Sequence, residues 1–199
     1  MLDHPIVLES FAIIDGEVGP HSLGPEAYAI CRRVIHATAD FDFLHLLSFS
    51  SEAIAAGIAG LRGGTPIITD VNLVKLGIAS LNAKTFQCPL ISALEGVETP
   101  PPGKTRSETG ILRCYQQYPG AIYVIGNAPT ALLALCRACA PSRQRPSLII
   151  GAPVGFVAVL ESKAALASLD GPKIIVEGRK GGSAAAAAIL NALIVLAWN

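Results

Sequence analysis

The sequence predicts an α/β protein, a three-layer doubly wound sandwich with a mainly parallel sheet. Strand-like and helix-like runs alternate along the chain, which is the pattern of such folds. Several strand-like runs, among them Ala121–Ile125 and Lys173–Val176, are almost continuously apolar, as expected of strands that helices cover on both faces. The 199 residues suffice for one sizeable core, so we expect residues 1–199 to form a single domain.

The expected elements follow one another as strand and helix. The expected strands are Phe43–Phe49, Pro66–Thr69, Phe86–Ser92, Ala121–Ile125, Ser147–Ile150 and Lys173–Val176. The expected helices are Pro25–Ala37, Ser51–Leu61, Asn72–Leu81, Ser107–Tyr118, Pro129–Cys139, Gly155–Leu169 and Ser183–Leu196. Pro25 and Pro129 suit a first helical turn. Asp70 or Asn72 can cap the helix after the second strand. The triple proline in Thr99–Lys104 predicts a stiff extended loop inside the domain.

The composition excludes several classes of protein. Hydrophobic residues make up 51% and charged residues 15%, which argues against a disordered chain. The 15 Lys and Arg residues balance 15 Asp and Glu residues, so no generally basic surface and no nucleic-acid partner are expected. Zero net charge with a mean hydropathy of +0.50 indicates a large buried face, which we interpret as an oligomer interface.

Neither a membrane span nor a secreted location is expected. The most apolar run, Ser183–Asn199, is interrupted by Asn191 and is shorter than the roughly 20 residues of a spanning helix, so we predict a core helix. The N-terminus lacks the basic region of a secretory signal, and the number of cysteines, 5, is odd, which favours reduced thiols in the cytoplasm. Cys136 and Cys139 form an isolated C-x-x-C, interpreted as buried apolar residues, and no metal is expected.

His36 is the candidate acid of this sequence. It stands at the C-terminal end of an expected amphipathic helix, where the helix dipole favours the protonated imidazole. A protonated imidazole can donate to a heteroatom of a substrate. The alternative is a histidine that only caps the helix.

Two basic segments next to expected helices are candidate anion sites. Gly178–Ser183 places Arg179 and Lys180 before the last helix, and Thr105–Ser107 places Arg106 after the proline loop. Helix N-terminal amides and an arginine fork both bind carboxylates. The alternative for each segment is an ordinary basic surface turn.

Nucleotide-binding motifs are missing from the sequence. Gly103–Thr105 resembles the end of a phosphate-binding loop, but Glu98 stands where that loop needs glycine. No G-x-G-x-x-G follows an expected strand, so no nucleotide cofactor is predicted.

A series of short segments runs in order from Ser10 to Asn191. These are Ser10–Ile14, Val34–Asp40, Thr69–Val71, Thr105–Ser107, Ile125–Leu132, Ile150–Val157, Glu161–Lys163 and Gly178–Ser183. Together they resemble the precorrin-8X methylmutases, also called cobalt-precorrin-8 methylmutases, of cobalamin biosynthesis.

The resemblance implies a flavodoxin-like fold, a homodimer and an isomerase with a corrinoid substrate. A methyl group would move from C11 to C12 of precorrin-8X or cobalt-precorrin-8, giving hydrogenobyrinic or cobyrinic acid. No cofactor is implied, because the methyl group is already on the substrate. The catalytic histidine of the family corresponds to His36, which we expect to act as a general acid on a ring nitrogen.

A flat apolar macrocycle with a rim of carboxylates needs an apolar slot and several anion sites. The expected substrate-binding residues are Ser10, Thr38, Thr105, Arg106, Asn127, Thr130, Arg179, Lys180, Gly181, Gly182 and Ser183. One competing hypothesis is a module that binds a tetrapyrrole or another polyanion without chemistry. The other is a methyltransferase that binds S-adenosylmethionine.

Overall fold

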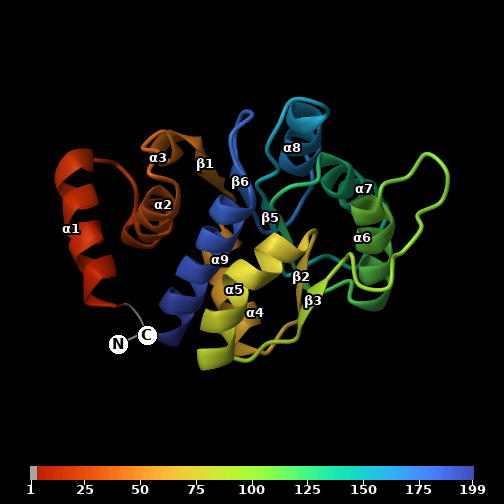
Figure 1. The fold of residues 1–199 in the computed structure, drawn as a ribbon, viewed down its shortest axis with the longest axis horizontal. Coiled ribbons are helices and arrows are strands. Elements are labelled where there is room, and N and C mark those ends of the chain that lie inside the picture. The colour runs from red at the N-terminus through yellow and green to blue at the C-terminus, as the bar shows by residue number, and fades with distance from the viewer. Residues whose placement is uncertain (1–3) are drawn as a thin grey trace.

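The computed structural model describes residues 4–199, and in this range a six-stranded sheet lies between two layers of helices (Figure 1). The strands are β1 (Leu47–Phe49), β2 (Ile67–Thr69), β3 (Leu90–Ser92), β4 (Ile122–Ile125), β5 (Leu148–Gly151) and β6 (Lys173–Val176). The helices are α1 (Pro5–Val18), α2 (Pro25–Thr38), α3 (Phe43–Leu46), α4 (Ala53–Arg62), α5 (Asn72–Lys84), α6 (Arg106–Gln117), α7 (Pro129–Cys139), α8 (Val159–Ala167) and α9 (Ser183–Trp198).

The strand order across the sheet is β1-β6-β5-β4-β2-β3. β1 pairs antiparallel with β6, and each of the other neighbouring pairs is parallel. Without β1, the parallel strands counted along the chain stand in the order 2-1-3-4-5, which is the flavodoxin-like order. The predicted doubly wound fold with a mainly parallel sheet is therefore confirmed, with one antiparallel strand added at its edge.

The strands are apolar on both faces because a separate core covers each face. Along β4, Ile122 and Val124 belong to the core under α2, α4, α5 and α9. Tyr123 and Ile125 belong to the core under α6, α7 and α8. Figure 1 shows these two groups of helices on opposite sides of the sheet, with α1 outside α2. Alternation between two cores explains the continuous apolar runs of the sequence.

The helix predicted from Ser183 is the central helix of its layer. The inner residues of α9 are buried against α2, α4 and α5. Among the helices of residues 4–199, none combines the length and hydropathy that a membrane span requires. The prediction of a core helix is confirmed.

The strand predicted over Phe43–Phe49 is wrong in its first half. Phe43–Leu46 forms the short helix α3, in which the amides of His45 and Leu46 donate to the Asp42 carbonyl at 2.9 and 3.1 Å. Only Leu47–Phe49 pairs in the sheet. A continuous apolar run fits a buried helical turn as well as a strand, so its pattern does not decide between them.

Two other predicted elements are shortened. The strand predicted over Phe86–Ser92 begins at Leu90, because the Asn82 side chain bonds both the amide and the carbonyl of Cys88 and holds the preceding loop. The helix predicted over Gly155–Leu169 is α8, which begins only at Val159. Gly155 and Ala158 take positive φ values of 130° and 57°, which no helix accommodates.

Helix α1 has no counterpart among the predicted elements. Its apolar residues surround the helix instead of forming one stripe, so Ile6, Leu8 and Ile13 remain exposed while Phe11 is buried. Sequence periodicity therefore gave no helical signal. The available signal was Pro5 in the first turn, preceded by His4, whose ring accepts from the Ile6 amide.

Candidate functional site

The predicted binding residues from three loops lie at one edge of the sheet. In a parallel sheet the loops that follow the strands emerge at the carboxyl edge. A Cβ added at Gly126, after β4, would lie 3.0 Å from Cα of Ser183, at the start of α9. Thr130 Oγ1, at the start of α7, lies 2.9 Å from Thr105 Oγ1, which caps α6. The structure therefore brings Asn127, Thr130, Thr105 and Ser183 to the same edge.

His36 occupies the last turn of α2, as predicted, and its side chain is exposed. Ser10 Oγ of α1 lies 2.7 Å from His36 Nδ1. The Phe11 ring meets the imidazole edge to face, with centroids 5.5 Å apart. In the part of the chain that the structure describes, no side chain bonds Nε2. The imidazole is thus held at Nδ1 and has one nitrogen left for a ligand.

His36 lines a slot between α2 and the N-terminal half of α9. The slot has a volume of about 260 Å³. Its lining residues are mostly small: Arg33, His36, Ala37, Gly77, Ala184, Ala187, Ala188 and Asn191. The alanines make apolar walls because they present only methyl groups. An apolar wall beside an imidazole suits the edge of a conjugated ring that carries nitrogen.

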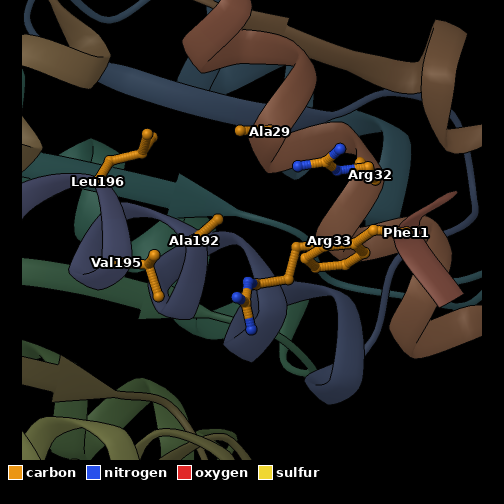
Figure 2. A pocket seen from close by; sticks show the side chains of 7 residues that line it. All are labelled: Phe11, Ala29, Arg32, Arg33, Ala192, Val195 and Leu196. Carbon is orange, nitrogen blue, oxygen red and sulfur yellow. The ribbon is translucent and has the colours of Figure 1, made fainter. Parts of the chain in front are cut away.

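A second, smaller cavity continues along the same two helices (Figure 2). It has a volume of about 60 Å³ and shares Arg33 with the slot. Figure 2 shows Ala29 and Arg32 of α2 on one side and residues of α9 on the other, with Phe11 beside them. The seam between α2 and α9 is therefore open at two adjoining places.

Asp70 binds the main chain before α7. Neither Asp70 nor Asn72 caps α5, which begins after Val71 without a side-chain cap, so the predicted cap is wrong. The fully buried carboxylate of Asp70 accepts from the amides of Gly126, Asn127 and Ala128 at 3.0, 2.8 and 2.7 Å. Burial raises the pKa of Asp70, and these three donors oppose that shift. β2 and β4 flank the point where the strand order reverses, the usual ligand crevice of this fold. Because Asp70 already occupies these amides, they have no place for the phosphate of a nucleotide.

The loop between β6 and α9 packs on the segment that follows β5. The Gly182 amide donates to the Ala152 carbonyl at 2.8 Å, so this predicted anion donor is used inside the protein. A Cβ at Gly181 would lie 2.4 Å from the same carbonyl oxygen, which explains the glycine. Arg179 is exposed, with its guanidinium carbon 5.8 Å from the centre of the Phe156 ring.

Lys180 is already paired within the chain. Its Nζ lies 2.7 Å from Asp40 Oδ2 and 2.6 Å from Asp42 Oδ2. The bond to Asp40 raises the pKa of Lys180, and the same bond lowers the pKa of Asp40. These contacts tie the loop before α9 to the turn that follows His36. A substrate carboxylate has to compete with two aspartates for Lys180.

The other predicted residues differ in how much of their bonding capacity is free. The hydroxyl of Thr38 donates to the Val34 carbonyl at 2.8 Å, so its donor is used within α2. Arg106 Nε donates to the Val97 carbonyl at 2.8 Å, while the residue remains exposed. Asn127 is exposed, and its main-chain amide is one of the three that donate to Asp70.

Sequence reasoning gave no role at the site to two buried charged residues near these loops, Asp70 and Lys163. Lys163 Nζ donates to the carbonyls of Gly178 and Lys180, both at 2.7 Å. Within residues 4–199 no group of three or more His, Cys, Asp or Glu side chains is placed to hold a metal ion. Cys136 and Cys139 are buried and unpaired, as predicted.

Comparison with known proteins identifies the family. The family model of the precorrin-8X methylmutases matches residues 5–196. The chain is 56% identical to the cobalt-precorrin-8 methylmutase of Synechocystis, over all of this chain and 98% of that protein. It is 38% identical to the cobalt-precorrin-8 methylmutase of Leptospira interrogans, over 94% of this chain and 91% of that protein.

The chain belongs to the precorrin-8X methylmutase family. The structure agrees, since the precorrin-8X methylmutase of Thermus thermophilus superposes with a TM-score of 0.88 at 40% identity, covering 96% of this chain and 95% of that one. The predicted family and isomerase class are thereby confirmed. The chain is a methylmutase, an intramolecular methyl transferase of cobalamin biosynthesis.

Proposed function

We propose that this methylmutase moves the methyl group of precorrin-8X or cobalt-precorrin-8 from C11 to C12, with His36 as the general acid. The product is hydrogenobyrinic or cobyrinic acid, an isomer of the substrate, so the step needs no co-reactant. The observation that carries the proposal is the position of His36, bonded at Nδ1 by Ser10 on the wall of an apolar slot.

The Ser10 bond suits an acid. When the imidazole is protonated, Nδ1–H donates to Ser10 Oγ and Nε2–H is left to face a ligand. Donation from Nε2 to a ring nitrogen withdraws electrons from the conjugated system and lowers the barrier to migration. General acid catalysis of this kind contributes about 10²–10⁴-fold. Exclusion of water and the ring conformation that the slot imposes supply the rest.

The carboxylates of the macrocycle have candidate partners at the carboxyl edge. Arg106, Arg179 and Asn127 are exposed there, and a guanidinium binds a carboxylate through two parallel bonds. The other candidates of the expected set are Gly181 and Ser183, together with Thr105 and Thr130, whose hydroxyls bond each other and would have to share that bond with a ligand. Lys180 joins them when it leaves Asp40 and Asp42.

We also propose that the enzyme works as a homodimer in the cytoplasm. Large apolar side chains remain exposed on α1 and after β5, including Ile13 at 57%, Phe156 at 84% and Val157 at 86%. Exposed apolar surface of this kind supports association with a second copy. Light scattering on the purified chain tests the dimer, and a monomer over the whole accessible concentration range contradicts it.

The deciding experiment is a visible-spectrum assay with precorrin-8 or its cobalt form and no S-adenosylmethionine. We expect conversion to the corrin chromophore by the wild type, and binding with turnover about 10²-fold slower or worse by H36A. H45A is a matched control, because His45 is exposed on α3 and outside the slot. Wild-type turnover in H36A contradicts the acid. A spectral shift without conversion leaves a tetrapyrrole carrier.

A further inference from the structure

Lys163 is a buried lysine whose side chain is bound to the main chain. The residue is 3% exposed, and its Nζ donates to the carbonyls of Gly178 and Lys180 at 2.7 Å each. An amine is costly to bury unless hydrogen bonds replace those lost to water. Burial lowers the pKa of Lys163 to about 8. Charged or neutral, the amine keeps at least two N–H donors, so both bonds survive its titration.

The two carbonyls that Lys163 holds flank Arg179 on either side. The carbonyl of Arg179 itself accepts from the Gly155 amide at 3.3 Å. Three successive peptide groups of the loop are therefore bound by α8 and the segment before it. The Arg179 side chain is left exposed, beside the ring of Phe156. The contacts hold the backbone of Arg179 and leave its guanidinium free to meet a ligand.

We infer that Lys163 is a positioning residue for substrate binding, which fixes the peptide groups around Arg179 so that its guanidinium meets a carboxylate of the macrocycle. Lys163 does not touch the substrate and acts through Arg179. The inference rests on the proposed function, because it requires a ligand with carboxylates. It goes beyond that proposal by naming the residue that prepares the anion site.

The physical reason is the geometry of the arginine fork. Two parallel bonds to one carboxylate form only when the guanidinium lies in the carboxylate plane. A loop that is free to move has to be ordered when the ligand binds, and this ordering weakens affinity. Lys163 orders the loop before the substrate binds. Since it acts only through Arg179, loss of Lys163 should weaken substrate binding only when Arg179 is present.

A double-mutant cycle separates this role from a general structural one. The probe is cobyrinic acid, a corrin polycarboxylate whose binding is followed by its visible spectrum. The proteins are the wild type, K163M, R179A and K163M/R179A. K173M is the matched control, because Lys173 also donates to a main-chain carbonyl, that of Leu169, on the opposite edge of the sheet.

We expect R179A to weaken binding by about 10- to 100-fold, the value of a hydrogen bond to a charged group. K163M should weaken binding about tenfold in the wild-type background and less than about twofold in the R179A background. K173M should bind like the wild type. An equal loss in both backgrounds assigns Lys163 a general structural role and overturns the inference, as does wild-type affinity in K163M.

A second measurement needs no ligand. Amide hydrogen exchange of residues 178–182 should accelerate in K163M and stay unchanged in K173M, and unchanged exchange in K163M overturns the inference. If K163M does not fold, K163Q replaces it, since glutamine is too short to serve both carbonyls. A wild type that binds cobyrinic acid without turning over the substrate contradicts the proposed function, while the cycle still decides the role of Lys163. A wild type that does not bind it contradicts both.

Discussion

Ser10 Oγ lies 2.7 Å from His36 Nδ1, and this hydrogen bond joins α1 to the last turn of α2. The contact spans two helices, of which the first carries Ser10 and Phe11 against the imidazole. α1 therefore contributes to the site by orienting the ring of His36. Phe11 and Ile14 of α1 are also buried in the core that α2 covers, with Val7 and Val18 packed against it.

The first prediction concerns this bond. In S10A the imidazole loses its partner at Nδ1 and samples other orientations, so kcat should fall about tenfold while the dissociation constant of the product changes little. Turnover assays with the cobalt-precorrin substrate measure the change. E9A, at the neighbouring exposed position of α1, is the control and should keep wild-type turnover. An S10A enzyme with unchanged kcat would leave Ser10 without a part in catalysis.

The second prediction concerns the apolar slot. Ala184 lines the slot and is exposed, so leucine at this position fills part of the space without overpacking the core. A184L should raise KM about tenfold, equivalent to about 1.4 kcal/mol of binding free energy, with unchanged unfolding in urea. A55L, at an exposed alanine of α4, is the control and should bind like the wild type. Equal KM values for both variants would place the macrocycle elsewhere.

The third prediction concerns the competition for Lys180. Asp40 and Asp42 hold Lys180 in the structure, so the double variant D40N/D42N releases its ammonium for the substrate. KM should fall by up to about fivefold in D40N/D42N and rise in K180A, because exposed ion pairs are individually weak. D170N changes an exposed aspartate outside this contact and is the control. A rise in KM in D40N/D42N would mean that the pairs shape the site instead of competing for it.

The fold was predictable because the strands between the two cores are continuous apolar runs in the sequence. The run of β4 is apolar at every position, and the bounds predicted for Pro129–Cys139 and Lys173–Val176 agree with α7 and β6. Such runs reflect burial on both faces, and burial on both faces decides the layer architecture. α1 left no such trace, because its apolar residues surround the helix.

The candidate site was predictable only in part. His36 and the basic loops stand out by residue type and by position at helix ends. Asp70 and Lys163 do not stand out in the sequence. Their roles depend on burial and on partners that are distant along the chain. Asp70 binds amides 56 to 58 residues away, and Lys163 binds carbonyls 15 and 17 residues away. Only the packing of the loops shows that these charges face main-chain groups and not solvent.

The last prediction concerns the pH dependence that Lys163 gives to stability. Burial lowers its pKa to about 8 in the folded protein, against about 10.4 in an unfolded chain. Below pH 8 Lys163 is protonated in the folded and in the unfolded chain, and the buried charge then lowers the free energy of unfolding by its full desolvation cost. Between these two values the unfolded chain holds a proton that the folded protein has released, so the free energy of unfolding rises with pH.

The rise should approach about 1.4 kcal/mol per pH unit and total about 3 kcal/mol once the pH exceeds both values. K163M lacks this group, so the stability of the wild type relative to K163M should grow by this amount from neutral to alkaline pH. Urea unfolding of both proteins across this range measures the difference in their free energies of unfolding. Titration of the tyrosines and cysteines contributes equally to both proteins and cancels in this difference. A difference that stays constant with pH would mean that Lys163 titrates alike in the folded and unfolded chain. The two carbonyls of Gly178 and Lys180 would then compensate fully for its burial.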